Sequence, residues 1–263
     1  MKGKVQLTLR GVEQILEGEC YSEGIVEIHG LEYHEDTLPL DIPKIGTVYG
    51  TLLNFKGMYE EYEPLMNENP YKSPPKAPIL YIKPKNTQIS HRQAIPLPKN
   101  IDGIEMNASL GLVIGKTATK VLEKEANEYI HGYTIVNDVT IPHQNIHRPA
   151  IKEKARDGFC PIGPWITCKH SNIDPNDLLI KVYVNDKLEQ EISTKYLCRS
   201  IEKLVADVTE FMTLYKGDVL LVGTPEKPPY AKLNDLVRIE IEGIGKLENR
   251  VIHEEELLRG DSL

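Results

Sequence analysis

Glycine and proline interrupt this chain at short intervals along its whole length. The 263 residues include 19 glycines and 18 prolines, and short apolar runs lie between them. Proline lacks the backbone donor that a helix interior needs, and glycine favours turns, so this pattern disfavours long helices. Short apolar runs bounded by turn residues are typical of β-strands. The sequence therefore predicts a β-rich α+β fold with a few short helices.

Apolar periodicity assigns the main elements. Helices are expected where apolar residues recur at three- and four-residue spacing, at 56–67, 122–131 and 200–214, with Ser200 as the N-cap of the last. Residues 184–188 are expected to form a hairpin turn. The clearest strand predictions are 110–114, 132–137, 178–184, 219–222 and 236–241.

The first part of the chain reads as a small lobe, which is expected to pack on the main domain or at a subunit interface. Residues 4–9 and 25–31 resemble strands, and the segment 38–44 contains two prolines and no helical periodicity. We interpret 38–44 as a linker. The expected organisation is a small N-terminal β lobe over residues 1–44 and a main domain over 45–263.

Composition excludes several classes of protein. The formal net charge is −8, which disfavours a nucleic-acid partner. No apolar stretch approaches the length of a membrane span, and the first residues lack the apolar core of a secretory signal. Four cysteines are too few for a disulfide scaffold. We expect a cytoplasmic enzyme or binding protein.

Two short patterns resemble a phosphate-binding loop and a zinc site, but neither is complete. Gly111 and Gly115 precede a lysine, but three residues separate these glycines where a phosphate-binding loop needs four. His143 and His147 have the spacing of two zinc ligands on a helix, but no third ligand accompanies them.

Polar and cationic residues gather after two predicted strands. Asn137 and Asp138 end the strand 132–137, and a run rich in histidine, lysine and arginine follows over 143–156. A second cationic stretch, 83–87, follows an apolar run. Local positive charge in an acidic chain predicts a small site for an anionic metabolite such as a carboxylate.

The order of several motifs is similar to that of the fumarylacetoacetate hydrolase superfamily. The similarity extends from about residue 46 to 252, and 69–87 and 148–163 resemble the N-terminal half of the family's bifunctional isomerase/decarboxylases of 4-hydroxyphenylacetate catabolism. The motifs are KPKNT (83–87), LGLVIGKTATKV (110–121), GYTIVNDV (132–139), KARDGFCPIGP (154–164), GDVLLVGTP (217–225) and IEGIGKLEN (241–249).

The resemblance implies a mixed β-roll and a bound Mg²⁺ or Mn²⁺ ion. Family members hold the metal with a Glu-x-Glu pair on one strand and a later Asp. In this chain Asn107 and Ser109 stand at the positions of the pair, and only Asp138 remains. Because side chains alternate along a strand, Glu105 is expected on the same side as Asn107 and is one route to a rebuilt site. Any metal binding here is expected to be weak or absent.

The resemblance also implies roles for individual residues. Lys154, Glu61 and Asp138 are the expected catalytic residues, with Lys154 stabilising an enolate. Met58 stands where the family commonly has a lid histidine, so Glu61 lacks that partner. Substrate binding is assigned to Lys83, Arg148, Asn145 and Thr224.

Two functions follow from these assignments. The first is isomerisation of 2-hydroxyhepta-2,4-diene-1,7-dioate or decarboxylation of 5-oxopent-3-ene-1,2,5-tricarboxylate. A keto–enol shift needs mainly a proton donor and acceptor, so a metal-poor site favours the isomerase step. The alternative is a catalytically silent subunit paired with a metal-bearing homologous chain. The expected partners are a small di- or tricarboxylate and a second chain, in a homodimer or heterodimer.

Overall fold

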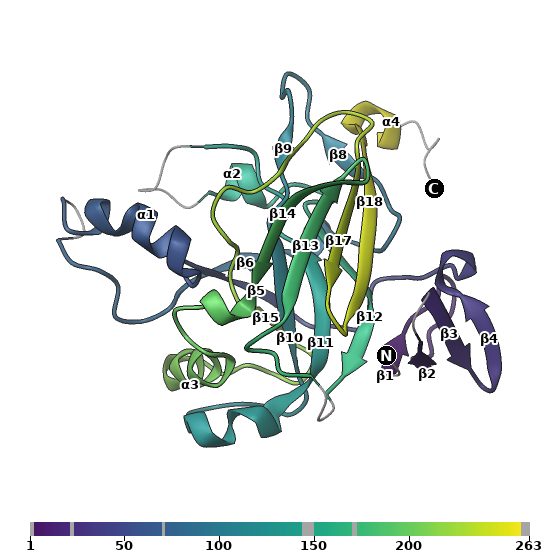
Figure 1. Ribbon diagram of the computed structural model, residues 1–263, viewed down its shortest axis with the longest axis horizontal. Helices are drawn as coiled ribbons and strands as arrows, with labels where there is room; N and C mark the ends of the chain where they lie inside the picture. Colours follow the sequence, from purple (N-terminus) through teal and green to yellow (C-terminus); the bar gives the residue numbers. More distant parts are fainter. Residues whose placement is uncertain (1–2, 22–23, 70–71, 144–149, 170–172, 259–263) are drawn as a thin grey trace.

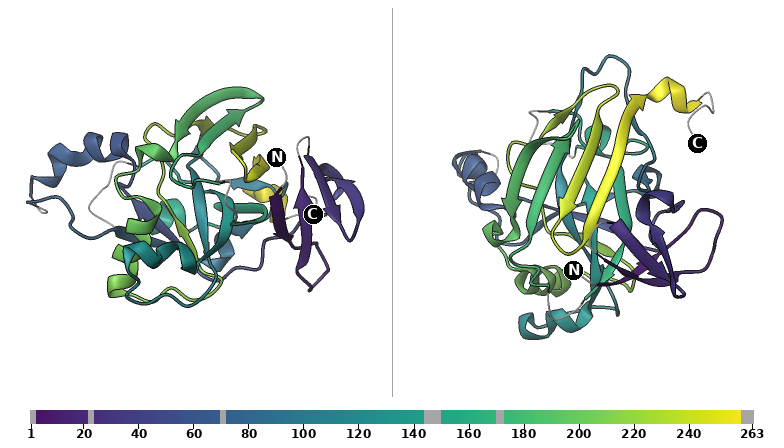
Figure 2. Two further views of the ribbon diagram at one scale, coloured as in Figure 1. Left: turned by 60° about the horizontal axis from the view of Figure 1, so that its bottom comes forward. Right: turned by 45° about the vertical axis from the view of Figure 1, so that its right-hand side comes forward.

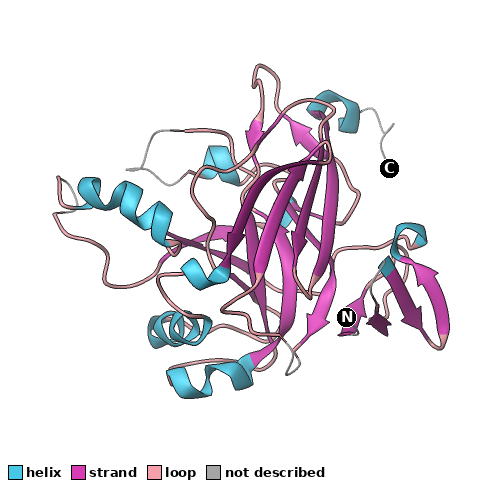
Figure 3. Ribbon diagram, in the orientation of Figure 1, coloured by secondary structure: helices cyan, strands magenta, loops and turns pink. Residues whose placement is uncertain are grey.

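Two β-sheets dominate the structure, and the helices lie at its periphery (Figures 1 and 3). This computed structural model describes residues 3–21, 24–69, 72–143, 150–169 and 173–258. The β-rich α+β class and the few short helices predicted from the sequence are confirmed.

Within the described residues, the larger sheet has eleven strands. β7 (Gln88–Ile89) pairs with β12 beside the main path of the sheet. Along that path the strands lie in the order β4 (Leu31–His34), β3 (Ile25–Ile28), β2 (Leu16–Cys20), β1 (Gly3–Leu7), β12 (Cys160–Cys168), β11 (Ile130–Asn137), β10 (Ala108–Ile114), β15 (Val219–Leu221), β5 (Val48–Leu52) and β6 (Ile79–Lys83).

The pairing of β7 closes part of this sheet on itself. β6 is the last strand of the path, yet the chain continues from it through the short 3-10 helix η3 (Lys85–Thr87) into β7, which runs parallel to β12. Strands β12, β11, β10, β15, β5 and β6 therefore form a roll, in agreement with the β-roll that the resemblance implies. The closure brings the end of β6 to the end of β11.

The second sheet covers one face of the roll. Its hydrogen-bonded order is β14 (Lys187–Ser193), β13 (Leu179–Val184), β17 (Leu236–Ile241), β18 (Gly245–His253) and β8 (Ile95–Leu97). Alternate residues of β13 are buried, as expected for a strand with one face on a core. A short pair, β9 (Ile104–Glu105) with β16 (Tyr230–Ala231), lies beside these sheets.

Every residue of β10 is buried, because each of its faces meets a different cluster of side chains. Leu110 and Leu112 point into the large core shared with the second sheet. Val113 belongs to a smaller apolar cluster inside the roll. Asn107 and Ser109 have the same parity as Val113, so their side chains face the interior of the roll.

The helices agree in part with the sequence predictions. α3 (Ile201–Phe211) begins after Ser200, whose hydroxyl accepts a hydrogen bond from the Lys203 amide at 3.2 Å, so the predicted N-cap is confirmed. The segment expected as an α-helix at 122–131 is the 3-10 helix η4 (Glu123–Tyr129). The remaining helices are α1 (Lys56–Met66), α2 (Ile151–Lys154), α4 (Glu254–Leu258), η2 (Glu35–Thr37) and η5 (Thr194–Tyr196).

No helix among the described residues is both long and apolar enough to cross a membrane. The predicted hairpin at 184–188 is confirmed. Asn185 and Asp186 link β13 to β14 and both have positive φ angles, 50° and 62°, which is the backbone that a tight hairpin turn requires.

The first four strands continue the larger sheet. β1 pairs with β12, and β1–β4 project to one side of the molecule (Figure 2). Leu40, in the segment expected to be a linker, is buried and forms a bridge with Leu9. Trp165 of β12 packs into the small core of this region.

A buried histidine fastens the segment after β7 to the second sheet. The ring Nδ1 of His91 accepts a hydrogen bond from the Glu248 amide at 3.1 Å, and the side chain is almost fully buried. Burial, with a smaller contribution from Arg92 and Lys246, lowers the pKa of His91 to about 4. The ring is therefore neutral in the folded protein at pH values where an unfolded histidine is protonated.

The free energy of unfolding should therefore decrease as the pH is lowered, and part of this decrease should depend on His91. The unfolded chain binds more protons than the folded chain between about pH 6.5 and pH 4, so the free energy of unfolding decreases as pH falls through this range. We expect wild type to lose about 2 kcal/mol between pH 7 and pH 5 that His91→Gln does not lose. Urea denaturation at both pH values measures this difference, and equal losses in the two proteins would contradict the assignment.

Candidate functional site

A buried carboxylate with two lysines forms the centre of the candidate site. The side chain of Asp138 is 0% exposed. Its Oδ1 lies 2.8 Å from the Lys83 ammonium, and its Oδ2 lies 2.7 Å from the Lys154 ammonium. The Tyr81 hydroxyl donates a second hydrogen bond to Oδ2. We refer to Tyr81, Lys83, Asp138 and Lys154 as the Asp138 cluster.

Four elements bring the cluster together. Asp138 directly follows β11, and its amide donates to the Asn107 carbonyl at 2.9 Å. Tyr81 and Lys83 lie on β6, which the closure of the roll carries to this point. Lys154 is the last residue of α2. The Tyr81 ring lies directly over Gly50 of β5, where an added Cβ would stand 2.0 Å from the ring, so only glycine fits there.

The two lysines keep Asp138 ionised. Burial alone raises the pKa of the Asp138 carboxyl, but the charges of Lys154 and Lys83 outweigh burial and hold the pKa well below its usual range. Burial and the neighbouring Asp138 carboxylate raise the pKa of Tyr81 well above its usual value. The hydroxyl therefore stays protonated and serves as a hydrogen-bond donor.

The ammonium groups of Lys83 and Lys154 differ in exposure and in whether an N–H donor is left without an acceptor. Lys83 is 0% exposed, forms an ion pair with Asp138, and donates hydrogen bonds to the carbonyls of Lys154 at 2.6 Å and Val139 at 3.4 Å. Lys154 is 16% exposed and donates to Asp138 and to Thr140 Oγ1, the latter at 2.7 Å. An ammonium has three N–H donors. Within the described part of the chain, Lys154 thus keeps one N–H without an acceptor.

The residues at the expected metal-ligand positions are engaged elsewhere. The Ser109 hydroxyl donates to the Gly223 carbonyl at 2.7 Å, and the Asn107 amide nitrogen lies 3.4 Å from Thr140 Oγ1. Glu105 pairs with Thr140 through two backbone hydrogen bonds and has a side-chain hydrogen bond with Asn107. Burial raises the pKa of the half-buried Glu105, although Lys154 acts in the opposite direction.

The other residues selected from the sequence have different surroundings. Glu61 is exposed on α1, and the half-buried Met58 packs against the main core. Thr224 is partly exposed and follows Gly223, the acceptor of the Ser109 bond. Asn145 and Arg148 lie outside the described residues.

The described cationic residues of 150–156 have different surroundings. Lys154 joins the Asp138 cluster, whereas Arg156 pairs with Glu254 at 3.1 Å and Lys152 is exposed. Sequence reasoning missed Tyr81 and Thr140, which bond Asp138 and Lys154. The available signal was parity, because Tyr81 is two residues before Lys83 on one strand and Thr140 is two residues after Asp138.

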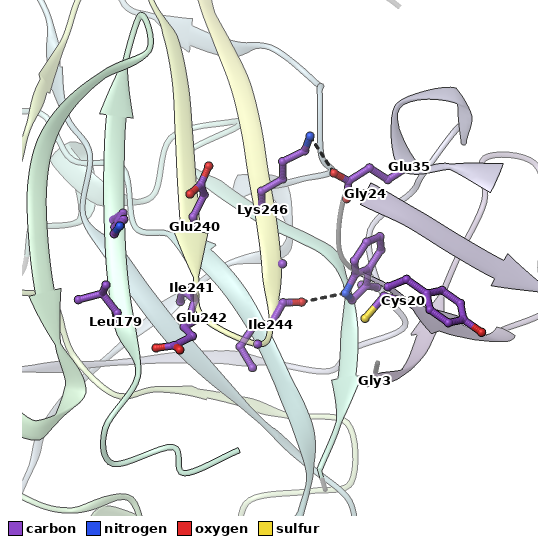
Figure 4. A pocket seen from close by; sticks show the side chains of 15 residues that line it. Gly3, Cys20, Gly24, Glu35, Leu179, Glu240, Ile241, Glu242, Ile244 and Lys246 are labelled. Atoms are coloured by element: carbon purple, nitrogen blue, oxygen red, sulfur yellow. Dashed lines mark hydrogen bonds and ion pairs between the residues drawn. The ribbon is translucent and has the colours of Figure 1, made fainter. Parts of the chain in front are cut away.

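A cleft of about 530 Å³ lies elsewhere, between the first strands and the second sheet. Figure 4 shows Lys246 directed towards Glu35 across this cleft, where their charged atoms are 2.7 Å apart. The Trp165 indole donates to the Ile244 carbonyl at 3.0 Å on its wall. The residues of the Asp138 cluster do not line it.

The chain belongs to the fumarylacetoacetate hydrolase family. The family model for the fumarylacetoacetate (FAA) hydrolase C-terminal region matches residues 47–252. The chain is also 40% identical over 212 residues to the 4-hydroxyphenylacetate degradation bifunctional isomerase/decarboxylase of Escherichia coli. That match covers 81% of this chain but 48% of the relative, so the chain spans about half the length of this enzyme.

Solved structures share the fold over nearly the whole chain. A 5-carboxymethyl-2-hydroxymuconate delta-isomerase from Mycobacterium smegmatis superposes with a TM-score of 0.76 at 29% identity, covering 96% of this chain and 99% of its own. A 2-hydroxyhepta-2,4-diene-1,7-dioate isomerase from Mycobacterium marinum has the same TM-score and coverage at 25% identity.

Metal binding separates this chain from what the family implies. A maleylpyruvate hydrolase from Sphingobium, which shares the fold at 20% identity (TM-score 0.76, covering 95% of this chain and 99% of its own), has been solved with manganese(II) and pyruvate. In the described part of this chain, no group of three or more His, Cys, Asp or Glu side chains is placed to share a metal ion. Mg²⁺ and Mn²⁺ favour carboxylate oxygens, and the one carboxylate at the expected position is already bonded to two ammonium groups. The described residues around Asp138 therefore do not fit a divalent metal.

Replacing Asp138 should destabilise the fold strongly. Asp138→Asn leaves two ammonium groups without their counter-charge, one of them completely buried. Breaking a buried ion pair in this way costs roughly 3–5 kcal/mol. Glu128→Gln is the matched control, because Glu128 pairs with Lys116 at the surface, where such pairs contribute at most about 1 kcal/mol. Urea denaturation measures both variants, and a loss below about 1 kcal/mol in Asp138→Asn would contradict this account.

Proposed function

We propose that this chain catalyses the keto–enol isomerisation of an unsaturated 2-hydroxy or 2-oxo dicarboxylate, and that 2-hydroxyhepta-2,4-diene-1,7-dioate is the substrate to test first. The Escherichia coli relative and the Mycobacterium marinum structure support this reaction class. The observation that carries the proposal is the Lys154 ammonium. Asp138 and Thr140 hold it in place, and no described residue accepts its third N–H, which leaves that donor for a ligand.

Isomerisation needs a group that stabilises an enolate. The enol O–H loses its proton, a carbon of the conjugated system gains one, and negative charge collects on the C2 oxygen between the two steps. A fixed, charged N–H directed at that oxygen stabilises the charge without having to reorganise during the reaction. Lys154 meets this requirement because Asp138 and Thr140 hold its ammonium in place.

The proton carriers are assigned differently from the sequence-based expectation. Asp138 stays ionised beside two lysines, so we assign it to positioning Lys154 rather than to proton transfer. Glu105 has a raised pKa and lies near Lys154, which suits a carboxyl that both takes up and releases a proton. Glu61, exposed on α1, is proposed to exchange protons with solvent.

Substrate carboxylates need further partners. Lys83 was the expected contact, but its side chain is completely buried, donates to two carbonyls and forms an ion pair with Asp138. We therefore assign Lys83 to holding Asp138. Arg148, Asn145 and Thr224 remain the proposed carboxylate-binding residues. Decarboxylation of 5-oxopent-3-ene-1,2,5-tricarboxylate leaves its electron pair on a similar enolate, so this compound is the second substrate to test.

A silent subunit is the competing proposal. The chain spans about half of the bifunctional relative, and it lacks both the Glu-x-Glu pair and the lid histidine. Under this proposal it pairs with a homologous metal-bearing chain and contributes structure rather than chemistry. A homodimer of this chain is the expected assembly if it is itself the isomerase.

Activity of the purified chain decides between the two. We expect loss of the dienol absorbance of 2-hydroxyhepta-2,4-diene-1,7-dioate above the buffer rate. Lys154→Met should lower kcat by about 10²–10³-fold, as removal of one oxyanion donor typically does. Lys152→Met is the matched control, since Lys152 is exposed on the same helix, and it should retain the wild-type rate.

Two outcomes would contradict the isomerase proposal. The first is a wild-type rate no higher than that of buffer for both test substrates. The second is full activity in Lys154→Met. Activity that appears only on mixing with a homologous chain would support the silent-subunit proposal instead.

A further inference from the structure

Both oxygens of the carboxylate that the family uses as a metal ligand lie within ion-pair distance of an ammonium group in this chain. Lys83 holds Asp138 Oδ1 at 2.8 Å, while Lys154 at 2.7 Å and the Tyr81 hydroxyl share Oδ2. A metal ion at this carboxylate would have to displace an ammonium group from a buried ion pair. That exchange is unfavourable because it leaves the displaced charge unpaired.

The charge balance also opposes a divalent cation. Two ammonium groups face a single carboxylate, so the Asp138 cluster carries a net charge of about +1. A Glu-x-Glu pair would add two negative charges, but Asn107 and Ser109 are neutral. At separations of a few Å and reduced dielectric, each unit charge contributes several kcal/mol. The cluster is therefore set up to attract an anion and to repel a metal ion.

The hydrogen bonds of Ser109 and Asn107 also argue against a metal ion. Ser109 directs its hydroxyl at the Gly223 carbonyl, and Asn107 directs its amide at the Thr140 and Glu105 side chains. Among the described residues, Tyr81 and Lys154 are the partly exposed members of the cluster, and Lys154 has one N–H without a protein acceptor.

We propose that the Lys154 ammonium, supported by Asp138 and Lys83, takes the place of the divalent cation, so that this site binds the carboxylate or enolate oxygen of a 2-oxo acid without metal. The inference rests on the proposed function for the identity of its ligand class. It adds that the electrophile is an ammonium group.

Calorimetry with oxalate tests the inference without requiring turnover. Oxalate is a planar dianion that resembles the enolate of a 2-oxo acid. In buffer with EDTA, wild type should bind oxalate saturably at one site per chain, and replacing EDTA by Mn²⁺ should change the Kd less than twofold. Lys154→Met should weaken binding at least tenfold, whereas the exposed Lys152→Met should leave the Kd unchanged.

Several results would overturn the inference. Oxalate binding that occurs only with Mn²⁺ would contradict it. Absence of oxalate binding both with EDTA and with Mn²⁺ would also contradict it. Saturable binding of Mn²⁺ alone to wild type, at one ion per chain, would also do so. An unchanged Kd in Lys154→Met would show that the anion binds elsewhere.

A gain-of-function variant provides a second, independent test. Asn107→Glu combined with Ser109→Glu restores the family's carboxylate pair on β10. We expect this variant to bind one Mn²⁺ ion, seen as loss of the free-ion signal in electron paramagnetic resonance, under conditions where wild type leaves the signal unchanged. Circular dichroism establishes whether the variant is folded, and if it is not, the wild-type titrations decide alone. Equal Mn²⁺ binding by both proteins would contradict the inference.

These measurements separate failure of the inference from failure of the proposed function. Metal-free oxalate binding without isomerase turnover would retain the anion site and reject the enzyme. Turnover that depends on Mn²⁺ would retain the enzyme and reject the ammonium electrophile.

Discussion

The ion pairs between Asp138 and two lysines connect parts of the chain that are far apart in sequence. Lys83 ends β6, Asp138 follows β11, and Lys154 ends α2. A buried charge is tolerated only when it is paired and hydrogen-bonded, so each partner requires the other two. The closure of the larger sheet through β7 and β12 provides this meeting point. The site and the roll are thus interdependent, because the strand arrangement that closes the sheet also neutralises Asp138.

The chain retains the frame of the family, and we propose that the Asp138 cluster gives its site a different electrophile. The match over residues 47–252 and the structural similarity show that the frame is retained. Asn107 and Ser109 are neutral side chains that face the interior of the roll, and the two lysines exceed the single negative charge of Asp138. An enolate needs positive charge close to its oxygen, and an anchored ammonium supplies it as a metal ion does.

Sequence reasoning succeeded where local rules decide the structure. Ser200 caps α3 because a serine hydroxyl can satisfy an orphan amide in the first turn, and the turn at Asn185 and Asp186 follows from their tolerance of positive φ. It was less accurate for 122–131, whose amphipathic spacing suits an α-helix, although the segment forms a 3-10 helix that packs beside α3. Local propensity is weak there compared with packing.

Non-local contacts account for what could not be predicted. The family resemblance selected Asp138, Lys154 and Lys83 as site residues. It did not predict that Lys83 is buried and pairs with Asp138. The position of Tyr81 depends on Gly50, which lies opposite it on the neighbouring strand β5. The expected linker at 38–44 packs through Leu40 against the first strands, and the sequence pattern alone does not show this contact.

Direct titration of Asp138 is the measurement that tests this account most closely. Carbon-13 labelling of aspartate carboxyls, with the Asp138 resonance assigned by its loss in Asp138→Asn, follows its ionisation by nuclear magnetic resonance. An ordinary aspartate is about half protonated near pH 4. The account predicts no change in the Asp138 shift between pH 7 and pH 4, because two ammonium groups hold the carboxylate ionised. A midpoint at or above pH 4 would show that the lysines do not control this site.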